Sequence, residues 1–298
     1  MKRSYFEPSN VQETLALLDQ HPDAAVVAGG TDIVVADRSG KKSLPATLIA
    51  IHRVQELRSI GPASTGGLRI GALVTHGELE DSGALREGWQ ALADASALVG
   101  SPATRSTGTI GGNVCNASPA MEVGSPLLVS EATVELASSS GTRTLPYADF
   151  VTGPARTTRR PNELLTAVIL PALPGGGRVS SAYVRLEYRQ AMEIAIVGAA
   201  ALIVLDANGR CAQARIALTA VAPTCVRVPA AETILRGQGL SSERLQLAAD
   251  ATAAAAKPID DVRGSAEYRR AMVPVIVRQA LELAISRSVP VAVASVPA

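Results

Sequence analysis

The chain has 298 residues and a formal net charge of +1, and 47% of its residues are hydrophobic while only 3% are aromatic. This length is enough for two domains that each bury a core, built mainly from aliphatic side chains. The near-zero charge does not favour a polyanionic partner, and neither a membrane-spanning apolar run nor a leader pattern is present, so we expect a soluble, cytoplasmic protein.

The first 60 residues predict a helix and two strands around a glycine turn. A helix begins at Ser9 or Asn10 and ends at His21-Pro22, because the residue before a proline disfavours helical geometry. Residues 24–28 and 47–51 are predicted strands. The first of them leads into Gly29-Gly30-Thr31-Asp32, and an apolar, helix-compatible run follows. A strand, a glycine turn and a helix start together present backbone N–H groups to a diphosphate, although this pattern matches neither GxGxxG nor a Walker loop.

The next segment predicts a turn, a strand and two helices before a second glycine-rich stretch. Residues 62–67 form a turn or a small-domain boundary, and residues 68–73 form a strand. Thr75 is placed to cap a short helix. Residues 85–99 carry apolar side chains at helical spacing, which predicts a longer helix.

The stretch from Gly108 to Pro126 is crowded with Gly, Asn, Ser, Thr and Pro, and we predict a loop there. Such a loop offers many free backbone N–H groups, and its glycines allow a phosphate or another backbone to approach closely. Glu122 adds an acceptor of the kind that holds a ribose hydroxyl. From the residues alone, a turn-rich connection without function is an equally good reading, since loops of this composition are common.

The rest of the chain predicts a hairpin, a linker and then a meander followed by helices. A short helix at 126–132 precedes a hairpin of 133–137 with 142–146, a strand at 163–170 and a linker at 171–177. Strands at 182–188, 195–205 and 211–221 include the hairpin signal Asn208-Gly209. Helices follow at 228–236, 242–256 and 266–287. A meander followed by helices indicates an α+β domain.

These elements divide the chain at the linker. We predict one domain at 1–173, with subdomains of about 1–60 and 61–173, and a C-terminal α+β domain at 178–288. Residues 289–298 carry no pattern and are predicted to be a flexible tail.

The sequence predicts neither a metal site nor a catalytic residue in this chain. Its cysteines, Cys115, Cys211 and Cys225, are scattered and have no iron–sulfur spacing, so any cluster must belong to a partner. The three histidines are isolated, and we interpret them as surface or structural residues. No nucleophile–base pair or carboxylate dyad indicates hydrolysis.

Four stretches together resemble one family. They are Val26-Val-Ala-Gly-Gly-Thr-Asp-Ile33, the segment Gly108–Pro126, the segment Pro161–Pro171 and the segment Gly264–Arg270. They resemble the FAD-binding medium subunit of the molybdenum hydroxylases, of the xanthine dehydrogenase and carbon monoxide dehydrogenase type. The resemblance covers nearly the whole chain. It implies an α+β fold: a two-part FAD-binding domain of the PCMH type, also found in vanillyl-alcohol oxidase, then a smaller domain of an antiparallel β-meander plus a three-helix bundle.

The resemblance also implies a role in electron transfer. A large molybdopterin-binding subunit oxidises the substrate, a small subunit relays electrons through two [2Fe-2S] clusters, and FAD on this chain passes them to an external acceptor. The complex would be a heterotrimer or a dimer of heterotrimers. Neither the substrate nor the acceptor can be named from this chain. The extra cluster-binding loop of the 4-hydroxybenzoyl-CoA reductase type is not expected, because no cysteine group here could serve it.

Carried over residue by residue, the resemblance implies a set of cofactor contacts from both loops. The first loop supplies Val26, Val27, Ala28, Gly29, Gly30, Thr31, Asp32 and Ile33, and the second supplies Gly108, Thr109, Gly111, Gly112, Asn113 and Ser118. Glu122 stands where the family has Asp, which keeps the carboxylate but lengthens its reach by one methylene. Ser125 stands where a Pro is usual.

Three further positions come from the second half of the pattern. Leu165 matches a position whose backbone lies near the adenine side of the cofactor. Arg185 matches a Lys that contacts the cofactor, and an exposed strand charge is the alternative reading. Ile194 stands where subunits of the carbon monoxide dehydrogenase type carry a Tyr near the flavin ring.

Two other functions remain open at this point. The chain could be a stand-alone FAD-dependent oxidoreductase, since other flavoenzymes share the architecture, or an assembly subunit that has lost flavin. Cys115 lies in the second loop, but no neighbour in the sequence would activate it for covalent attachment. Arg156, Arg159 and Arg160 form a basic cluster that would either dock the iron–sulfur subunit or stand as a solvated loop.

Overall fold

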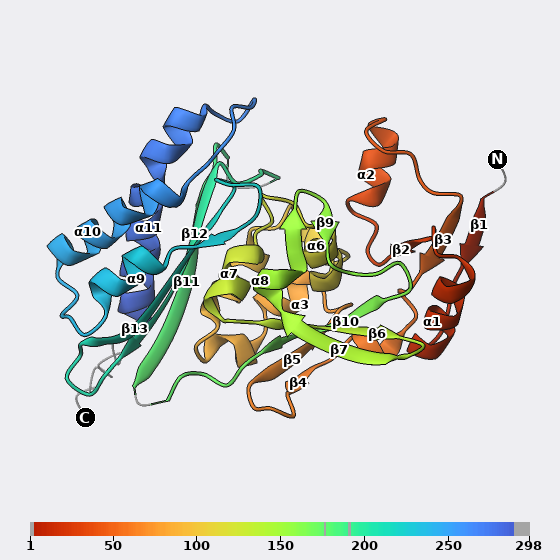
Figure 1. Ribbon diagram of the computed structural model, residues 1–298, viewed down its shortest axis with the longest axis horizontal. Coiled ribbons are helices and arrows are strands. Elements are labelled where there is room, and N and C mark those ends of the chain that lie inside the picture. Colours follow the sequence, from red (N-terminus) through yellow and green to blue (C-terminus); the bar gives the residue numbers. More distant parts are fainter. Residues whose placement is uncertain (1–2, 176, 190–191, 289–298) are drawn as a thin grey trace, which may run out of the picture.

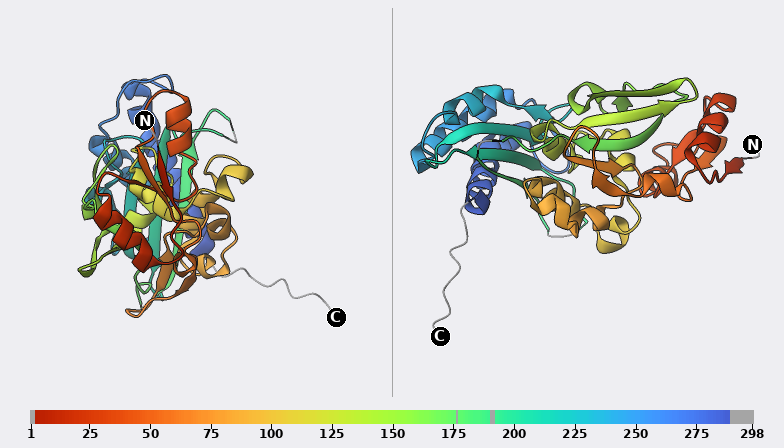
Figure 2. Two further views of the ribbon diagram at one scale, coloured as in Figure 1. Left: turned by 90° about the vertical axis from the view of Figure 1, so that its right-hand side faces the viewer. Right: turned by 90° about the horizontal axis from the view of Figure 1, so that it is seen from below.

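The structure is a computed structural model that describes residues 3–175, 177–189 and 192–288. Its elements form three packed parts in a row, with the N-terminus at one end and the C-terminal part at the other (Figure 1). Two further views show that this row makes the molecule elongated (Figure 2). The predicted tail at 289–298 lies outside the described residues.

The N-terminal part is a small parallel sheet covered by one helix. Its strands β1 (Ser4–Phe6), β2 (Ala25–Val27) and β3 (Thr47–Ala50) lie in the order β1-β3-β2, and α1 (Val11–Gln20) packs on them. Asn10 caps α1, because its side chain accepts a hydrogen bond of 2.8 Å from the backbone of Glu13. The helix α2 (Ile33–Arg38) begins directly after the first glycine turn. The sequence did not predict β1, because three residues are too few to show an alternation.

The middle part is an antiparallel sheet with helices packed against it. The strands follow the order β4-β5-β10-β6-β7. Their bounds are β4 (Ile60–Pro62), β5 (Leu68–Gly71), β6 (Thr133–Ser138), β7 (Gly141–Pro146) and β10 (Leu164–Leu170). The helices are α3 (His76–Glu80), α4 (Gln90–Ala97), α5 (Pro102–Arg105), α6 (Ile110–Asn116), α7 (Gly124–Val129) and α8 (Tyr147–Phe150), and β8 (Val151–Gly153) pairs with β9 (Arg156–Thr157).

Two local predictions in this part were wrong. The expected helix at 85–99 is interrupted, because Gly88 has φ +110°, and only residues 90–97 form α4. The expected loop at 108–126 contains α6 and the start of α7. Thr109 caps α6 by accepting a hydrogen bond of 3.0 Å from the Gly112 N–H. A composition typical of loops therefore forms a helix here, since tertiary packing overrides weak propensity.

The C-terminal part is a four-stranded antiparallel sheet covered on both faces. Its strands are β11 (Arg178–Leu186), β12 (Val197–Leu205), β13 (Cys211–Thr219) and β14 (Val226–Arg227), in that order. The helices α9 (Pro229–Leu235), α10 (Ser242–Thr252) and α11 (Ala266–Ser288) cover one face. Helices α4 and α7 of the middle part cover the other. Double coverage explains why all nine residues of β12 are buried and apolar or glycine.

The α+β class and the meander followed by three helices are therefore confirmed. Three separate apolar cores occupy the N-terminal, middle and C-terminal parts, and a fourth joins α4 and α7 to the C-terminal sheet. The domain bounds at residues 173 and 178 stay a prediction.

Candidate functional site

The two glycine-rich stretches, far apart in the sequence, lie against each other. A Cβ atom placed on Gly29 would lie 1.9 Å from the carbonyl oxygen of Thr107 and 3.1 Å from the Cα of Gly108. One placed on Gly108 would lie 3.4 Å from the hydroxyl oxygen of Thr31. Gly30 has φ +71°, a left-handed conformation that glycine adopts without strain. The first loop therefore closes on the second through backbone contacts that only glycine permits.

The second loop is also hydrogen-bonded to the segment between β5 and α3. Thr75 and Thr109 form an isolated antiparallel bridge, and the N–H of His76 donates to the carbonyl of Gly108 at 3.0 Å. The N–H of Gly111 donates to the carbonyl of Ala72 at 3.0 Å, and a Cβ on Gly111 would lie only 2.7 Å from Ala72. The glycines of this motif thus serve close packing as well as access to a ligand.

Two buried polar atoms near this junction have no hydrogen-bond partner within the described residues. One is the Oδ1 of Asn113, on α6, and the other is the Nδ1 of His76, the first residue of α3. Buried polar atoms in native proteins are nearly always paired, so each marks a place where a ligand or a water would complete the structure. Asn113 belongs to the predicted contact set, and His76 does not.

The histidine at this junction is neutral. Its side chain is 1% exposed, and burial, assisted by the charge of Arg105, lowers its pKa to about 4. The interpretation of His76 as structural agrees with its position behind Gly108. The sequence did not predict that His76 lies against Gly108, because these two residues are 32 positions apart and no local pattern marks their contact.

The structure brings Glu122 and Arg185 together, rather than leaving either on the surface. The Nη1 of Arg185 donates to Oε1 of Glu122 at 2.5 Å, and Tyr183 donates from its hydroxyl to Oε2 at 2.5 Å. Arg185 also pairs with Glu187 through its Nε at 2.6 Å. The reading of Arg185 as an exposed strand charge is therefore wrong, because its side chain is 1% exposed.

Ser118 lies at a cavity between the middle and C-terminal parts. The cavity has a volume of about 280 Å³, and its lining includes Ser118, Pro119 and Ala120 of the second loop, with Ile194, Ile259 and Lys257 across from them. The second loop turns here through Ala117, which has φ +49° and whose carbonyl accepts from the N–H of Ala155 at 3.0 Å. Ser118, an expected cofactor contact, and Ile194, which the resemblance places near the flavin ring, thus line one cavity.

Leu165 lies apart from the loop junction. It is 4% exposed, belongs to β10 and packs in the core of the middle part. The strand β10 contacts α6, so Leu165 is connected to the second loop through the sheet. Its side chain serves packing, and only its backbone could face a ligand.

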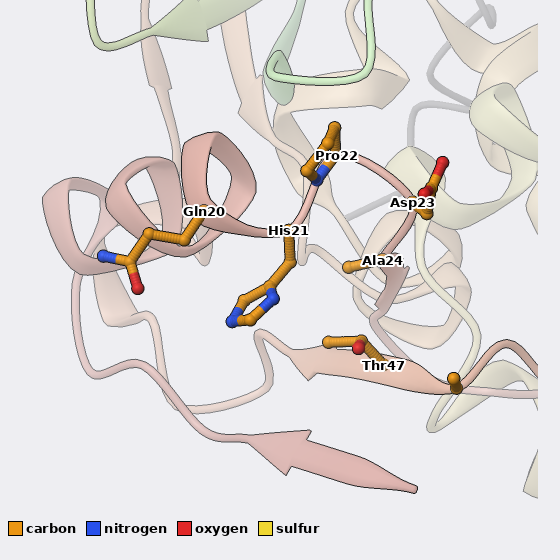
Figure 3. A pocket seen from close by; sticks show the side chains of 7 residues that line it. Gln20, His21, Pro22, Asp23, Ala24 and Thr47 are labelled. Carbon is orange, nitrogen blue, oxygen red and sulfur yellow. The ribbon is translucent and has the colours of Figure 1, made fainter. Parts of the chain in front are cut away.

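A second cavity of about 290 Å³ lies away from both loops (Figure 3). It is lined by the end of α1 and by the starts of β2 and β3, including His21, Asp23 and Thr47. His21 stacks on Phe6 with ring centroids 5.0 Å apart. Since the glycine loop follows the carboxyl end of β2, this cavity lies at the opposite edge of the parallel sheet, where open α/β sheets do not usually bind ligands.

The basic cluster is partly structural. Arg159 donates from Nη1 to the carbonyls of Arg160, Pro161 and Glu163, at 3.0, 3.3 and 2.7 Å. Its guanidinium therefore holds the turn before β10. In the described ranges no three His, Cys, Asp or Glu side chains gather as metal ligands, and no helix there is both long and apolar enough to cross a membrane.

The structure combines two glycine loops packed against each other with a C-terminal part in which a four-stranded antiparallel sheet is followed by three helices. Residues 1–173 match the family described as "FAD binding domain in molybdopterin dehydrogenase", and residues 182–284 match the "CO dehydrogenase flavoprotein C-terminal domain". The chain belongs to this family: it is an FAD-binding subunit of the molybdenum hydroxylase type, related to those of xanthine and carbon monoxide dehydrogenases.

Individual relatives support the same assignment over the full length. The chain is 29% identical to the xanthine dehydrogenase FAD-binding subunit of Escherichia coli O157:H7, over 95% of this chain and 96% of that protein. It is 33% identical to 6-hydroxypseudooxynicotine dehydrogenase complex subunit alpha of Paenarthrobacter nicotinovorans, over 96% and 95%. A solved structure of carbon monoxide dehydrogenase from Hydrogenophaga pseudoflava matches with a TM-score of 0.90 at 33% identity, covering 97% of this chain and 99% of that chain.

Proposed function

We propose that this chain is the electron-transfer subunit of a heteromeric molybdenum hydroxylase, and that it passes electrons from the [2Fe-2S] clusters of a partner subunit to an external acceptor through FAD. The observation that carries the proposal is the closure of the two glycine loops on each other, with Gly29 against the backbone of Thr107. The full-length match to subunits named as parts of dehydrogenase complexes supports it.

The residues at the loop junction fit the cofactor. Loop one, at residues 26–33, turns at Gly30, which has φ +71°, between β2 and the start of α2, and a glycine turn of this kind presents backbone N–H groups to a diphosphate. Loop two adds the unpartnered buried Oδ1 of Asn113 and the start of α6, where the hydroxyl of Thr109 accepts a hydrogen bond from the Gly112 N–H. Ser118 lines the same cavity as Ile194, whose position the resemblance places near the flavin ring. FAD, when bound, supplies both one-electron and two-electron chemistry.

The protein's own contribution is to hold and orient the cofactor. The loop backbone would neutralise the diphosphate charge by donating hydrogen bonds, and the cavity beside Ser118 offers both apolar side chains, such as Ile194, and charged ones, such as Lys257. Arg185 and Glu122 are engaged with each other and would act on the cofactor indirectly.

The proposed partners are a large molybdopterin-binding subunit and a small [2Fe-2S] subunit, in a heterotrimer or a dimer of heterotrimers. Cys115, Cys211 and Cys225 are free thiols, and burial raises the pKa of each to about 11 or 12. Thiols of this kind are poor cluster ligands, since the ligand is the thiolate, so we place the clusters on the partner.

A stand-alone flavoenzyme is the second candidate, and a flavin-free assembly subunit is the third. The mutual packing of both glycine loops disfavours loss of flavin. This chain aligns over about 95% of its residues with proteins named as subunits of dehydrogenases, which favours a subunit of a complex over a stand-alone enzyme.

The experiment that tests the proposal is the visible spectrum of the purified chain, with released flavin identified by chromatography. We expect oxidised-flavin bands and about one FAD per chain. A folded chain that stays colourless when FAD is added would refute the proposal and favour an assembly subunit. Co-purification with a molybdopterin-binding and an iron–sulfur subunit would separate the complex from a stand-alone enzyme.

A further inference from the structure

The end of the second loop is bonded to the C-terminal sheet through buried polar groups. Glu122 is 6% exposed and Ser125 is fully buried. Both bond across to the sheet. Glu122 accepts from Tyr183 and Arg185 at 2.5 Å each, and Ser125 accepts from the Thr219 hydroxyl at 2.7 Å.

The sheet is built to present these partners together. Tyr183 and Arg185 are two residues apart on β11, so both point to the same face. Arg185 lies opposite Gly198 on β12, and Gly198 lies opposite Thr219 on β13. Arg185, Gly198 and Thr219 therefore form one row across the sheet. A Cβ on Gly198 would lie 2.4 Å from the Tyr183 hydroxyl. Glycine at this position therefore makes the space that the tyrosine needs to reach Glu122.

We propose that Glu122, Tyr183, Arg185 and Glu187, which we name the interdomain cluster, position the second cofactor loop, so that Glu122 and Tyr183 are positioning residues and not direct cofactor ligands. The inference rests on the proposed function. Glu122 is four residues beyond Ser118 and follows the left-handed turn at Ala117. A displacement of Glu122 would therefore be passed to the part of the loop that lines the cavity.

The cluster is sensitive to pH. Burial raises the pKa of Glu122 to about 6, while the charge of Arg185 and the hydrogen bond from Tyr183 oppose the rise, and Glu187 adds to it. Tyr183 and Cys225 also titrate near Glu122, and both are protonated at neutral pH, because burial raises the pKa of Tyr183 well above its ordinary value and that of Cys225 to about 12. Protonation of Glu122 removes the charge that Arg185 contacts, and so loosens the loop.

The test measures FAD affinity from pH 5 to pH 8 for the wild-type chain and for Tyr183→Phe. We expect wild-type affinity to fall about 10-fold as the pH drops through about 6, a size usual for coupling between two sites. Tyr183→Phe removes a donor that favours the carboxylate, so its transition moves to higher pH. Glu122→Gln abolishes the transition. Tyr5→Phe, on the exposed strand β1, is the matched control and should follow the wild-type curve.

Far-UV circular dichroism at each pH confirms that the chain is folded throughout. If Tyr183→Phe does not fold, Glu122→Asp serves instead, because it withdraws the carboxylate from Tyr183 by one methylene and should weaken FAD binding at pH 7.5. Identical pH curves for wild type and Tyr183→Phe, or equal affinity of wild type and Glu122→Asp, overturn the positioning role while leaving the proposed function in place. A folded wild-type chain that binds no FAD at any pH overturns both.

Discussion

Replacing Gly29 by alanine is the sharpest test of how the two loops meet. The added Cβ would lie 1.9 Å from the Thr107 carbonyl oxygen, about 1.5 Å short of ordinary van der Waals contact. No rotamer change can relieve the clash, because a backbone atom is the neighbour. The two loops must therefore separate, and a forced shift of packed atoms costs about 1–3 kcal/mol.

If that cost falls on the closed loop pair that binds FAD, the affinity for FAD falls about 5-fold to 150-fold, since 1.4 kcal/mol corresponds to a factor of ten. The assay is an equilibrium titration of the flavin-free chain with FAD, followed by flavin fluorescence. Circular dichroism reports whether the fold is retained. The loss should appear in FAD affinity with little change in the spectrum of the apoprotein, because the clash is between the Cβ added at Gly29 and the backbone of Thr107 and removes no apolar side chain from the cores.

The matched control is Gly61→Ala on the edge strand β4, where an added Cβ would have no neighbour within 4 Å. It should bind FAD as the wild type does and be as stable or slightly more so, because alanine restricts the unfolded chain. Wild-type FAD affinity in Gly29→Ala would refute the proposed packing of the loops. Equal losses in both variants would show that the effect is not specific to the loop junction.

Three further predictions follow from single sites. Gly30→Val should abolish detectable FAD binding in a folded chain, because a β-branched residue is strained at φ +71°, and full flavin occupancy by absorbance would contradict this. Each cysteine should resist a thiol reagent at pH 8 until denaturant is added, since burial raises all three pKa values to about 11 or 12; rapid labelling of the native chain would be the contrary result. Burial raises the pKa of Asp261, but hydrogen bonds from Arg263 outweigh burial and hold this pKa at about 2. The ionised carboxylate therefore stabilises the fold at pH values above the ordinary pKa of Asp. This stabilisation is lost as the pH falls through about 2. Asp261→Asn should therefore be less stable than wild type to urea at pH 7, with a gap that narrows below pH 4; a gap independent of pH would contradict the assignment.

Local patterns predicted most of the fold. The strands expected at 24–28 and 47–51 correspond to β2 and β3, and the meander around Asn208-Gly209 corresponds to β12 and β13. Turn residues and apolar alternation are set by neighbours in the sequence, so they can be read from it. Gly88 shows the limit: the apolar spacing continues across it, but its left-handed conformation interrupts the predicted helix, which begins only at Gln90.

Local patterns also located the two glycine-rich stretches, but they did not predict that the second contains a helix. Residues 110–116 are helical because Thr109 caps them and because their glycines allow α6 to lie against the backbone of Ala72. A window of Gly and Asn has low helix propensity, so the sequence favoured a loop. The contact that decided the outcome joins residues about 40 positions apart, and a single sequence does not show such pairs.

The positions at which a motif departs from its family are easily misread for the same reason. In the sequence alone, Glu122 in place of Asp only lengthens the reach of the carboxylate by one methylene, and Ser125 in place of Pro has no evident role. In the folded chain, the longer side chain reaches Tyr183 and Arg185, and the serine accepts a hydrogen bond from Thr219. Gly198 leaves the space for the tyrosine that completes the arrangement. Since a buried carboxylate without these partners would be strongly unfavourable, the effect of a change at Glu122 depends on the composition of the C-terminal sheet as much as on the cofactor.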